Sequence, residues 1–338
     1  MKNLTLILLA LFAAQTLRAQ KLDLKKLSEF SVETSETRNV KLGDRKPEHT
    51  TEKYTFQFIN QGETADGYKL SCKMVRANIR HDYSGLFLFN SDSIRNTLTN
   101  NSAILEPLFF LENPFTVYVS NDGKTIKAEG IDELMQRAFT KWHIEESTRE
   151  WFNENTAKKI TSTLRKIFIE LPEQKIAYSS TWENKATGVN YKVTAIAGAL
   201  LTITGTGADT LTAKYTLNDS NGLLEDAKTH WKRLIDSIRW VETVDYTQKL
   251  IYDKHIAASV DTAWAGMALT LSWNSLLRPG LSGRVDSATA FTYFKHYDPL
   301  YATDPYYIKQ KVTLVNQMRL KDNDIYKQLV IKTPHKYL

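Results

Sequence analysis

The sequence predicts an α+β fold: a large, curved antiparallel sheet with a helical insert, followed by an α-helical C-terminal region. Three observations lead to this fold class. Apolar and polar residues alternate with period two in two separate parts of the chain, and tight-turn sequences lie within each part. Between these parts, and again after the second, the apolar residues recur at helical spacing. An antiparallel sheet with one apolar face needs helices or a second sheet to cover that face.

The N-terminus has the pattern of a signal peptide. Lys2 precedes an apolar run from Leu4 to Ala14, which is too short for an ordinary transmembrane helix. We place the cleavage after Ala19, because a small residue suits the signal peptidase there. A lipid anchor would need a cysteine just after the apolar run, and the only cysteine is Cys72. We therefore predict a signal peptide over residues 1–19 and a periplasmic or secreted protein with no stable membrane span after cleavage.

The first set of strands follows a polar lead-in. Residues 54–58 and 68–74 alternate with period two and flank the turn Asp66-Gly67. A further strand over 115–119 runs into Asn121-Asp122-Gly123 and returns through Ile126, and Asp-Gly supplies the positive φ angles of a tight hairpin. The residues from 85 to 111 receive no assignment.

A helical insert near residues 130–171 follows. From Gly130 the apolar residues form one helical stripe as far as Trp142. Ser147 and Glu150 make a capping box that predicts a second helix. A third helix from Thr156 is expected to bury Ile160, Leu164, Ile167 and Phe168 and to stop before Pro172.

The second set of strands is expected over residues 191–217, with turns at Gly205-Thr-Gly207 and Asp219-Ser-Asn221-Gly222. Residues 223–244 fit a helix or a strand, and we favour two strands that turn at Asp236-Ser237. From Gln248 to the end, helical spacing predominates. The predicted organisation is therefore a signal peptide (1–19), a sheet domain with the helical insert (20–247) and a helical C-terminal region (248–338).

Composition excludes several functional classes. A single cysteine excludes an internal disulfide, and Cys72 lies on an alternating strand face, which favours a buried structural thiol. The formal net charge is +6, but lysines and arginines are dispersed, so nucleic acid is not an expected partner. The histidines and the cysteine do not show zinc-ligand spacing, and no cofactor motif is present. His143 and Glu146 are three residues apart, which is typical of an exposed helix start.

Catalytic patterns are equally sparse. The chain has no Gly-x-Ser-x-Gly elbow. His81 precedes Asp82 at a strand end, a pairing that can orient an imidazole for proton transfer, but neighbours on a strand point to opposite faces. We predict no catalytic and no metal-binding residue.

Aromatic residues offer the one candidate binding site. A cluster of tyrosines in the C-terminal region could line a groove for a sugar ring or a peptide, since their rings supply contact area at low entropy cost. Equally, these rings could attach short helices to the sheet. The candidate ligand-binding residues are Tyr293, Tyr297, Tyr301, Tyr306 and Tyr307.

Some motifs resemble those of a known group of proteins. They are the signal peptide ending at Ala19-Gln20, the hairpin from Phe115 to Lys124, the helix start at Gly130, Leu171-Pro172, and the turn from Tyr215 to Gly222. Together they resemble a family of uncharacterised exported proteins of Bacteroidota-type Gram-negative bacteria, a domain of unknown function, over roughly residues 53–244. The resemblance implies a periplasmic or secreted location and transfers no catalytic residue.

Three functional hypotheses remain open. The first is a non-enzymatic binding protein of the cell envelope that holds an apolar small molecule between sheet and helices. The second is an accessory module whose helical tail docks an envelope protein partner, for example a thioredoxin-like reductase. The third is an envelope hydrolase, which would need His81, Asp82 and a distant carboxylate in one cleft.

Overall fold

The computed structural model describes residues 21–82, 86–91, 105–111, 113–141, 146–185, 187–236 and 240–252. It also describes four single positions near the C-terminus: Asp298, Thr303, Ile308 and Lys311. The predicted signal peptide, residues 1–19, lies outside the described residues. Within the described part of the chain, none of the helices has the length and apolar character needed to cross a bilayer.

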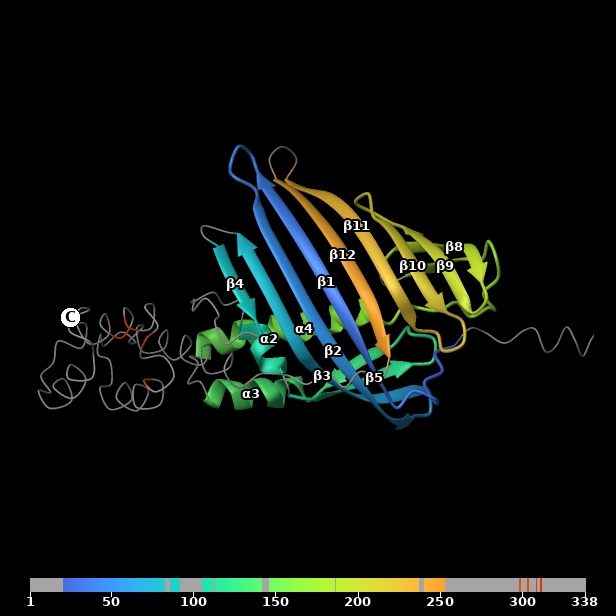
Figure 1. Cartoon of the computed structure of the whole chain (residues 1–338), viewed down its shortest axis with the longest axis horizontal. Helices are drawn as coiled ribbons and strands as arrows, with labels where there is room; N and C mark the ends of the chain where they lie inside the picture. The colour runs from blue at the N-terminus through green and yellow to red at the C-terminus, as the bar shows by residue number, and fades with distance from the viewer. Residues whose placement is uncertain are drawn as a thin grey trace, which may run out of the picture.

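In the described part of the chain, twelve strands form one antiparallel sheet, which curves around a layer of helices (Figure 1). The strands are β1 (Glu29–Leu42), β2 (Glu48–Glu63), β3 (Gly67–Asp82), β4 (Leu86–Asn90), β5 (Phe115–Ser120), β6 (Ile126–Glu129), β7 (Thr181–Asn184), β8 (Val189–Ala197), β9 (Leu200–Thr206), β10 (Thr212–Asn218), β11 (Leu224–Asp236) and β12 (Trp240–Tyr252). Their order across the sheet is β6-β5-β3-β2-β1-β12-β11-β10-β9-β8-β7. β4 lies outside this order and pairs with the C-terminal part of β3, from Asn78 to Asp82. The strand pairs expected from the sequence are thus confirmed, and they include β11 and β12, in which Asp236 is opposite Trp240.

β1 is the centre of the sheet, although the sequence marked it as a polar lead-in. It pairs with β2 on one side and with β12 on the other, in a register that runs from Phe30 opposite Tyr252 to Leu42 opposite Trp240. The first and last described strands therefore join the two halves of the sheet. This pairing is the most non-local in the fold, because it connects residues that are about 200 positions apart in the chain.

Among the described residues, three helices cover one face of the sheet: α2 (Leu105–Phe110), α3 (Ile131–Lys141) and α4 (Glu146–Ile167). The stripe from Ile131 is confirmed as α3. The second and third helices expected from Ser147 and Thr156 are a single helix, α4, which runs across the strands (Figure 1). Four residues were predicted to be buried here, and all are at most 5 % exposed: Ile160, Leu164 and Ile167 on α4, and Phe168 directly after it.

The core consists of two apolar clusters on the helix side of the sheet. One lies between the helices and β1, β2, β3 and β5, where Phe30 stacks on Phe58 with ring centroids 5.0 Å apart and Phe168 meets Phe58 edge-on at 5.5 Å. The other lies beneath β8 to β12 and contains Tyr191 and Tyr215. These clusters fill the apolar half of the curved face.

The prediction of an α+β fold with a helical C-terminal region is wrong. The described residues form mostly one antiparallel sheet, and helices make a minor contribution. Residues Gln248 to Tyr252 end strand β12 instead of beginning a helix. Gln248 and Leu250 alternate with exposed residues, as in a strand. Pairing with the edge of β1 makes this segment a strand rather than a helix. The rest of the predicted helical region lies outside the described residues, apart from the four single positions.

Candidate functional site

The inner face of the sheet, which faces α4, changes from apolar to polar along its two central strands. On β1 the residues of this face are, in order, Phe30, Val32, Thr34, Glu36 and Arg38. Their direct partners on β2 are, in the same order, Phe58, Phe56, Tyr54, Glu52 and Thr50. The apolar halves of the strands contribute to the core, so the polar halves form a separate charged surface beside it.

α4 covers this charged surface with one side of the helix. Its residues Lys159, Ser162, Thr163 and Lys166 are spaced i, i+3, i+4 and i+7, which places them on one face. The residues on the other side, Ile160, Leu164 and Ile167, are buried in the core. The apolar side of α4 therefore packs on the core, and this packing turns Lys159 and Lys166 towards the charged surface of the sheet.

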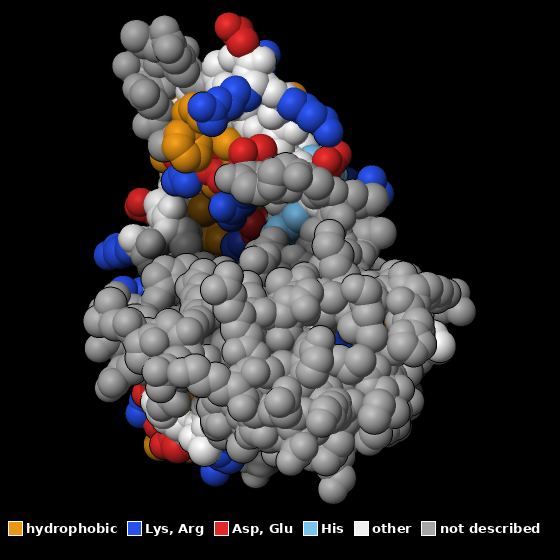
Figure 2. Space-filling view, turned by 90° about the vertical axis from the view of Figure 1, so that its left-hand side faces the viewer, with side chains coloured by type: hydrophobic (Ala, Val, Ile, Leu, Met, Phe, Trp, Pro, Cys, Tyr) orange, Lys and Arg blue, Asp and Glu red, His pale blue; other side chains and the backbone are white. Residues whose placement is uncertain are grey.

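A cavity of about 490 Å³ lies between α4 and the polar half of the sheet, and we call it the central cavity. Its lining residues are Thr34, Glu36, Arg38, Thr50, Glu52, Tyr54, His81, Lys159, Ser162, Thr163, Lys166 and Tyr246. Figure 2 shows acidic, basic and histidine side chains gathered around a recess on the described part of one face of the molecule. A volume of this size falls within the roughly 300–1,000 Å³ typical of small-molecule sites.

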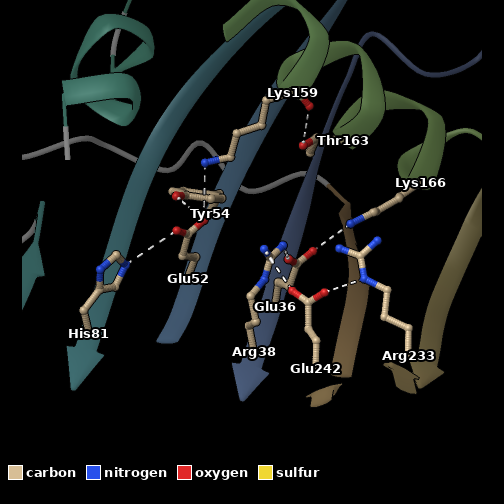
Figure 3. Close-up of polar contacts among 10 residues, drawn as sticks. All are labelled: Glu36, Arg38, Glu52, Tyr54, His81, Lys159, Thr163, Lys166, Arg233 and Glu242. Atoms are coloured by element: carbon tan, nitrogen blue, oxygen red, sulfur yellow. Dashed lines mark hydrogen bonds and ion pairs between the residues drawn. The ribbon is translucent and has the colours of Figure 1, made fainter. Parts of the chain in front are cut away.

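Two ion pairs link the sheet to the helix across the cavity (Figure 3). Lys166 Nζ is 2.7 Å from Glu36 Oε2, and it also lies 5.0 Å from the centre of the Tyr246 ring. Lys159 Nζ is 3.6 Å from Glu52 Oε2. Each carboxylate on the sheet wall thus has an ammonium group on the helix wall opposite.

A third carboxylate continues the network along the sheet. Glu242 of β12 is only 2 % exposed and lies between two arginines, with Arg38 Nη1 at 3.2 Å and Arg233 Nε at 2.7 Å. Arg38 also binds Glu36 at 3.0 Å, so it connects Glu242 to the cavity (Figure 3). A buried carboxylate is tolerated when it is paired and hydrogen-bonded in this way.

Glu52 has the most perturbed acidity in the cavity. Burial acts to raise its pKa, but the neighbouring His81, the charge of Lys159 and a hydrogen bond from Tyr54 outweigh burial and lower the pKa to about 2. His81 Nε2 is 3.6 Å from Glu52 Oε1, and the Tyr54 hydroxyl donates to Glu52 Oε2 at 2.9 Å. Glu52 is therefore a carboxylate, and an acceptor only, at any ordinary pH.

The same balance holds at the neighbouring groups. Burial opposes the charge of Glu36, but Lys166 and Arg38 lower its pKa below the ordinary glutamate value. Burial and the nearby Glu36 both raise the pKa of the Tyr246 hydroxyl, which stays protonated and donates to Gln248 Oε1 at 2.9 Å. The cavity therefore presents fixed charges of both signs.

The structure separates the two residues that were considered for a hydrolase. His81 does not pair with Asp82: it faces Glu52, whereas Asp82 binds Lys46 at 3.3 Å on the outside. The three-residue cluster that a hydrolase would need is therefore not assembled from Asp82. Among the described residues, no group of three or more histidine, cysteine or acidic side chains is placed to hold a metal ion. Cys72 is a free, fully buried thiol whose pKa is raised by burial, as the strand pattern predicted.

Sequence reasoning did not find the central cavity. The five candidate tyrosines from Tyr293 to Tyr307 lie outside the described residues, so that site stays a prediction. One signal was present: the alternation of Tyr54, Phe56 and Phe58 continues backwards to Glu52 and Thr50 on the same face. Charged residues on the buried face of a strand indicate a lined cavity or a paired network.

Known structures resemble this chain only weakly. A structure on lipid–protein interactions in lipovitellin matches with a TM-score of 0.40 and 11% identity; the match covers 90% of this chain and 36% of that one. The chain thus spans about a third of the lipovitellin chain. A DUF1329 family protein from Desulfovibrio piger matches with a TM-score of 0.18 and 9% identity, covering 69% of this chain and 90% of that one. A LolA superfamily protein from Nitrosomonas europaea matches with a TM-score of 0.12 and 9% identity, covering 67% and 87%. Likeness at this level assigns no ligand.

Sequence comparison gives a family match without a function. No curated protein matches the chain. The predicted resemblance to a domain of unknown function is confirmed at that level, whereas the bacterial group and the export signal stay predictions. The segment from the β2–β3 turn to the start of β11, residues 65–224, matches the model of DUF6263, a family of unknown function.

Proposed function

We propose that this protein is a non-enzymatic binding protein that holds a small amphiphilic molecule in the central cavity. The observation that carries the proposal is the position of the cavity, where a charged half of the sheet meets the apolar core under a single helix. A polar group of the ligand would lie among the ion pairs, and an apolar part would lie along the rings of Tyr54 and Tyr246. The exported cell-envelope location remains part of this proposal.

The arrangement of charges supports a ligand with a polar head. The sheet wall carries Glu36 and Glu52, and the helix wall carries Lys159 and Lys166. These groups already form ion pairs with one another. A ligand therefore binds favourably only if its charges replace an existing ion pair with an equally strong one, or if it binds beside the pairs without breaking them. A dipolar or zwitterionic head meets that condition, whereas an unpaired charge does not.

The apolar part of the ligand has less room in the described structure than the sequence suggested. The apolar half of the inner sheet face is filled by core side chains such as Phe30, Phe56 and Phe58, each at most 1 % exposed. An entirely apolar ligand between sheet and helices would have to displace them. An amphiphile that contacts the rings from the polar side leaves the core intact.

The experiment is native mass spectrometry of the protein purified from its own envelope fraction, followed by lipid extraction and apolar-dye titration. We expect a retained small molecule and saturable dye binding. Ser162→Trp should abolish both, because this exposed residue lines the cavity and a ring there fills it. Arg165→Trp is the matched control, since Arg165 is exposed on the same helix and does not line the cavity. A bare protein that binds no dye would refute the proposal.

The alternative role, in which the helical tail docks a partner domain, concerns residues outside the described part of the chain. It stays a prediction. Residues 248–252 belong to β12, so the segment from Gln248 cannot be removed without cutting a strand of the sheet. The test is therefore whether the whole chain binds an envelope protein.

A further inference from the structure

The β8–β9 hairpin ends in an exposed aliphatic tip. Every residue from Ala195 to Leu200 is exposed, including Ile196 at 47 % and Leu200 at 41 %. The sequence contains no ionisable side chain between Lys192 and Asp209. Hairpin turns ordinarily carry Asn, Asp or Gly with polar neighbours, and here the turn is Ala-Gly-Ala. We call residues 195–200 the hairpin tip; it belongs to the end of the sheet that carries β8 and β9 in Figure 1.

The tip is apolar on both of its faces. Ile196 is directly opposite Leu201, so these two side chains share one face; Ala197 is opposite Leu200, and this pair shares the other face. A flat protein surface can cover only one face of a hairpin. Burial of Ile196 and Leu200 together therefore needs an environment that encloses the tip, and the interfacial region of a lipid bilayer is such an environment.

An aromatic residue lies beside the base of the tip. Tyr178 is 68 % exposed, and the next two residues, Ser179 and Ser180, form backbone hydrogen bonds with Val193 of β8. Of the large apolar side chains that the described structure exposes, Tyr178, Ile196 and Leu200 gather at this hairpin. A tyrosine next to aliphatic residues is the arrangement found at membrane–water interfaces, where the ring lies at headgroup level.

The charges around the tip are balanced. The amide of Asp219 donates to the carbonyl of Ala199 at 2.7 Å, and Asp219 lines a surface recess together with Lys21 and Lys175. Lys25, Asp23 and Glu63 line the same recess, so it carries three lysines and three acidic residues and neither sign predominates. Binding at this end must therefore depend on apolar contact rather than on attraction to an anionic surface.

We infer that the hairpin tip inserts into the interfacial region of a lipid bilayer and docks the protein on a membrane surface. This inference is independent of the central cavity, because none of the tip residues lines it. A docked orientation would bring the β8–β9 end of the sheet to the membrane.

The test is co-sedimentation of the chain from Gln20 with phosphatidylcholine vesicles, with and without phosphatidylglycerol, at low and high salt. We expect binding to both kinds of vesicle and little effect of salt. Ile196→Asp and Leu200→Asp should each weaken partitioning about tenfold or more, because each removes a buried aliphatic group and adds a charge. Leu234→Asp is the control: Leu234 is 66 % exposed, but it lies at the far end of β11.

A second readout locates the contact. Cys72 is fully buried, so a thiol-directed fluorophore should label an introduced cysteine selectively. Ala197→Cys carrying an environment-sensitive dye should shift to shorter emission wavelength on vesicle addition, and Leu234→Cys should not. Absence of vesicle binding by the unmodified chain, an equal loss in Leu234→Asp, or an unchanged spectrum at position 197 overturns the inference.

Discussion

Glu36 of β1 and Glu52 of β2 are directly opposite each other on the same face of the sheet. Like charges in this position destabilise a sheet unless a counter-charge is supplied. Here Lys166 and Lys159 of α4 supply it, one lysine for each glutamate. The sheet therefore tolerates the two carboxylates because α4 docks beside them. The central cavity lies between α4 and this part of the sheet.

This coupling can be measured with a double-mutant cycle on Glu36→Gln and Lys166→Met. We expect a coupling free energy on the order of 1 kcal/mol, because the pair is only partly exposed. Urea denaturation of the four proteins gives the value. The pair Lys127–Glu129, which is largely solvated at the edge of the sheet, should show no resolvable coupling. Equal coupling in both pairs would contradict a special role for the cavity.

The low pKa of Glu52 predicts a pH dependence of stability. Since the folded-state pKa is lowered to about 2 from an ordinary value of 4.5, the stabilisation is fully present above about pH 5 and is lost as the pH falls toward 2. Its full size is on the order of 3 kcal/mol. Glu52→Gln should flatten the curve of unfolding free energy against pH between 5 and 2, by roughly that amount.

The control for Glu52 is Glu33→Gln. Glu33 is an exposed residue on the outer face of β1, and its replacement should leave the acid limb of the stability curve in place. If both variants keep the same acid limb as the parent protein, the environment assigned to Glu52 is incorrect.

Glu242 should contribute more to stability than an exposed acidic residue on the same strand. Glu242→Ala leaves Arg38 and Arg233 without a shared carboxylate, but both arginine side chains are nearly half exposed, so water can solvate them. We therefore expect a loss of about 1–3 kcal/mol rather than the larger cost of a fully buried charge. Asp245→Ala, which removes an exposed pair with His230, should cost at most about 1 kcal/mol. Thermal unfolding of both variants decides the order.

Gly123 should not tolerate a side chain. Its φ is +69°, and an added Cβ would collide with the carbonyl oxygen of Ile169, which belongs to the segment that leaves α4. Gly43 has a similar φ of +56°, but no other atom lies within 4 Å of a Cβ added there. Gly123→Ala should therefore lose several kcal/mol, and Gly43→Ala only about 1 kcal/mol, from backbone strain. Equal melting temperatures for the two variants would contradict the close approach at Gly123.

Much of the local structure could be predicted from the sequence. The period-two alternation and the Asp-Gly turn at residues 122–123 identified the β5–β6 hairpin, and the stripe from Ile131 identified α3. These features depend on neighbours a few residues apart, so the chain specifies them by itself. The burial of Cys72 also followed from its place on an alternating strand.

Only the tertiary structure decided the centre of the sheet and the cavity. β1 carries Glu36 and Arg38 on its inner face and therefore looked polar, and it became a central strand because β12 and β2 pair with its two edges. Gln248 to Tyr252 became strand for the same reason. The partners of Glu36 and Glu52 come from α4, more than 100 residues away, and their approach depends on how the helix docks on the core. Register and docking are long-range properties, so no local pattern in the chain determines them.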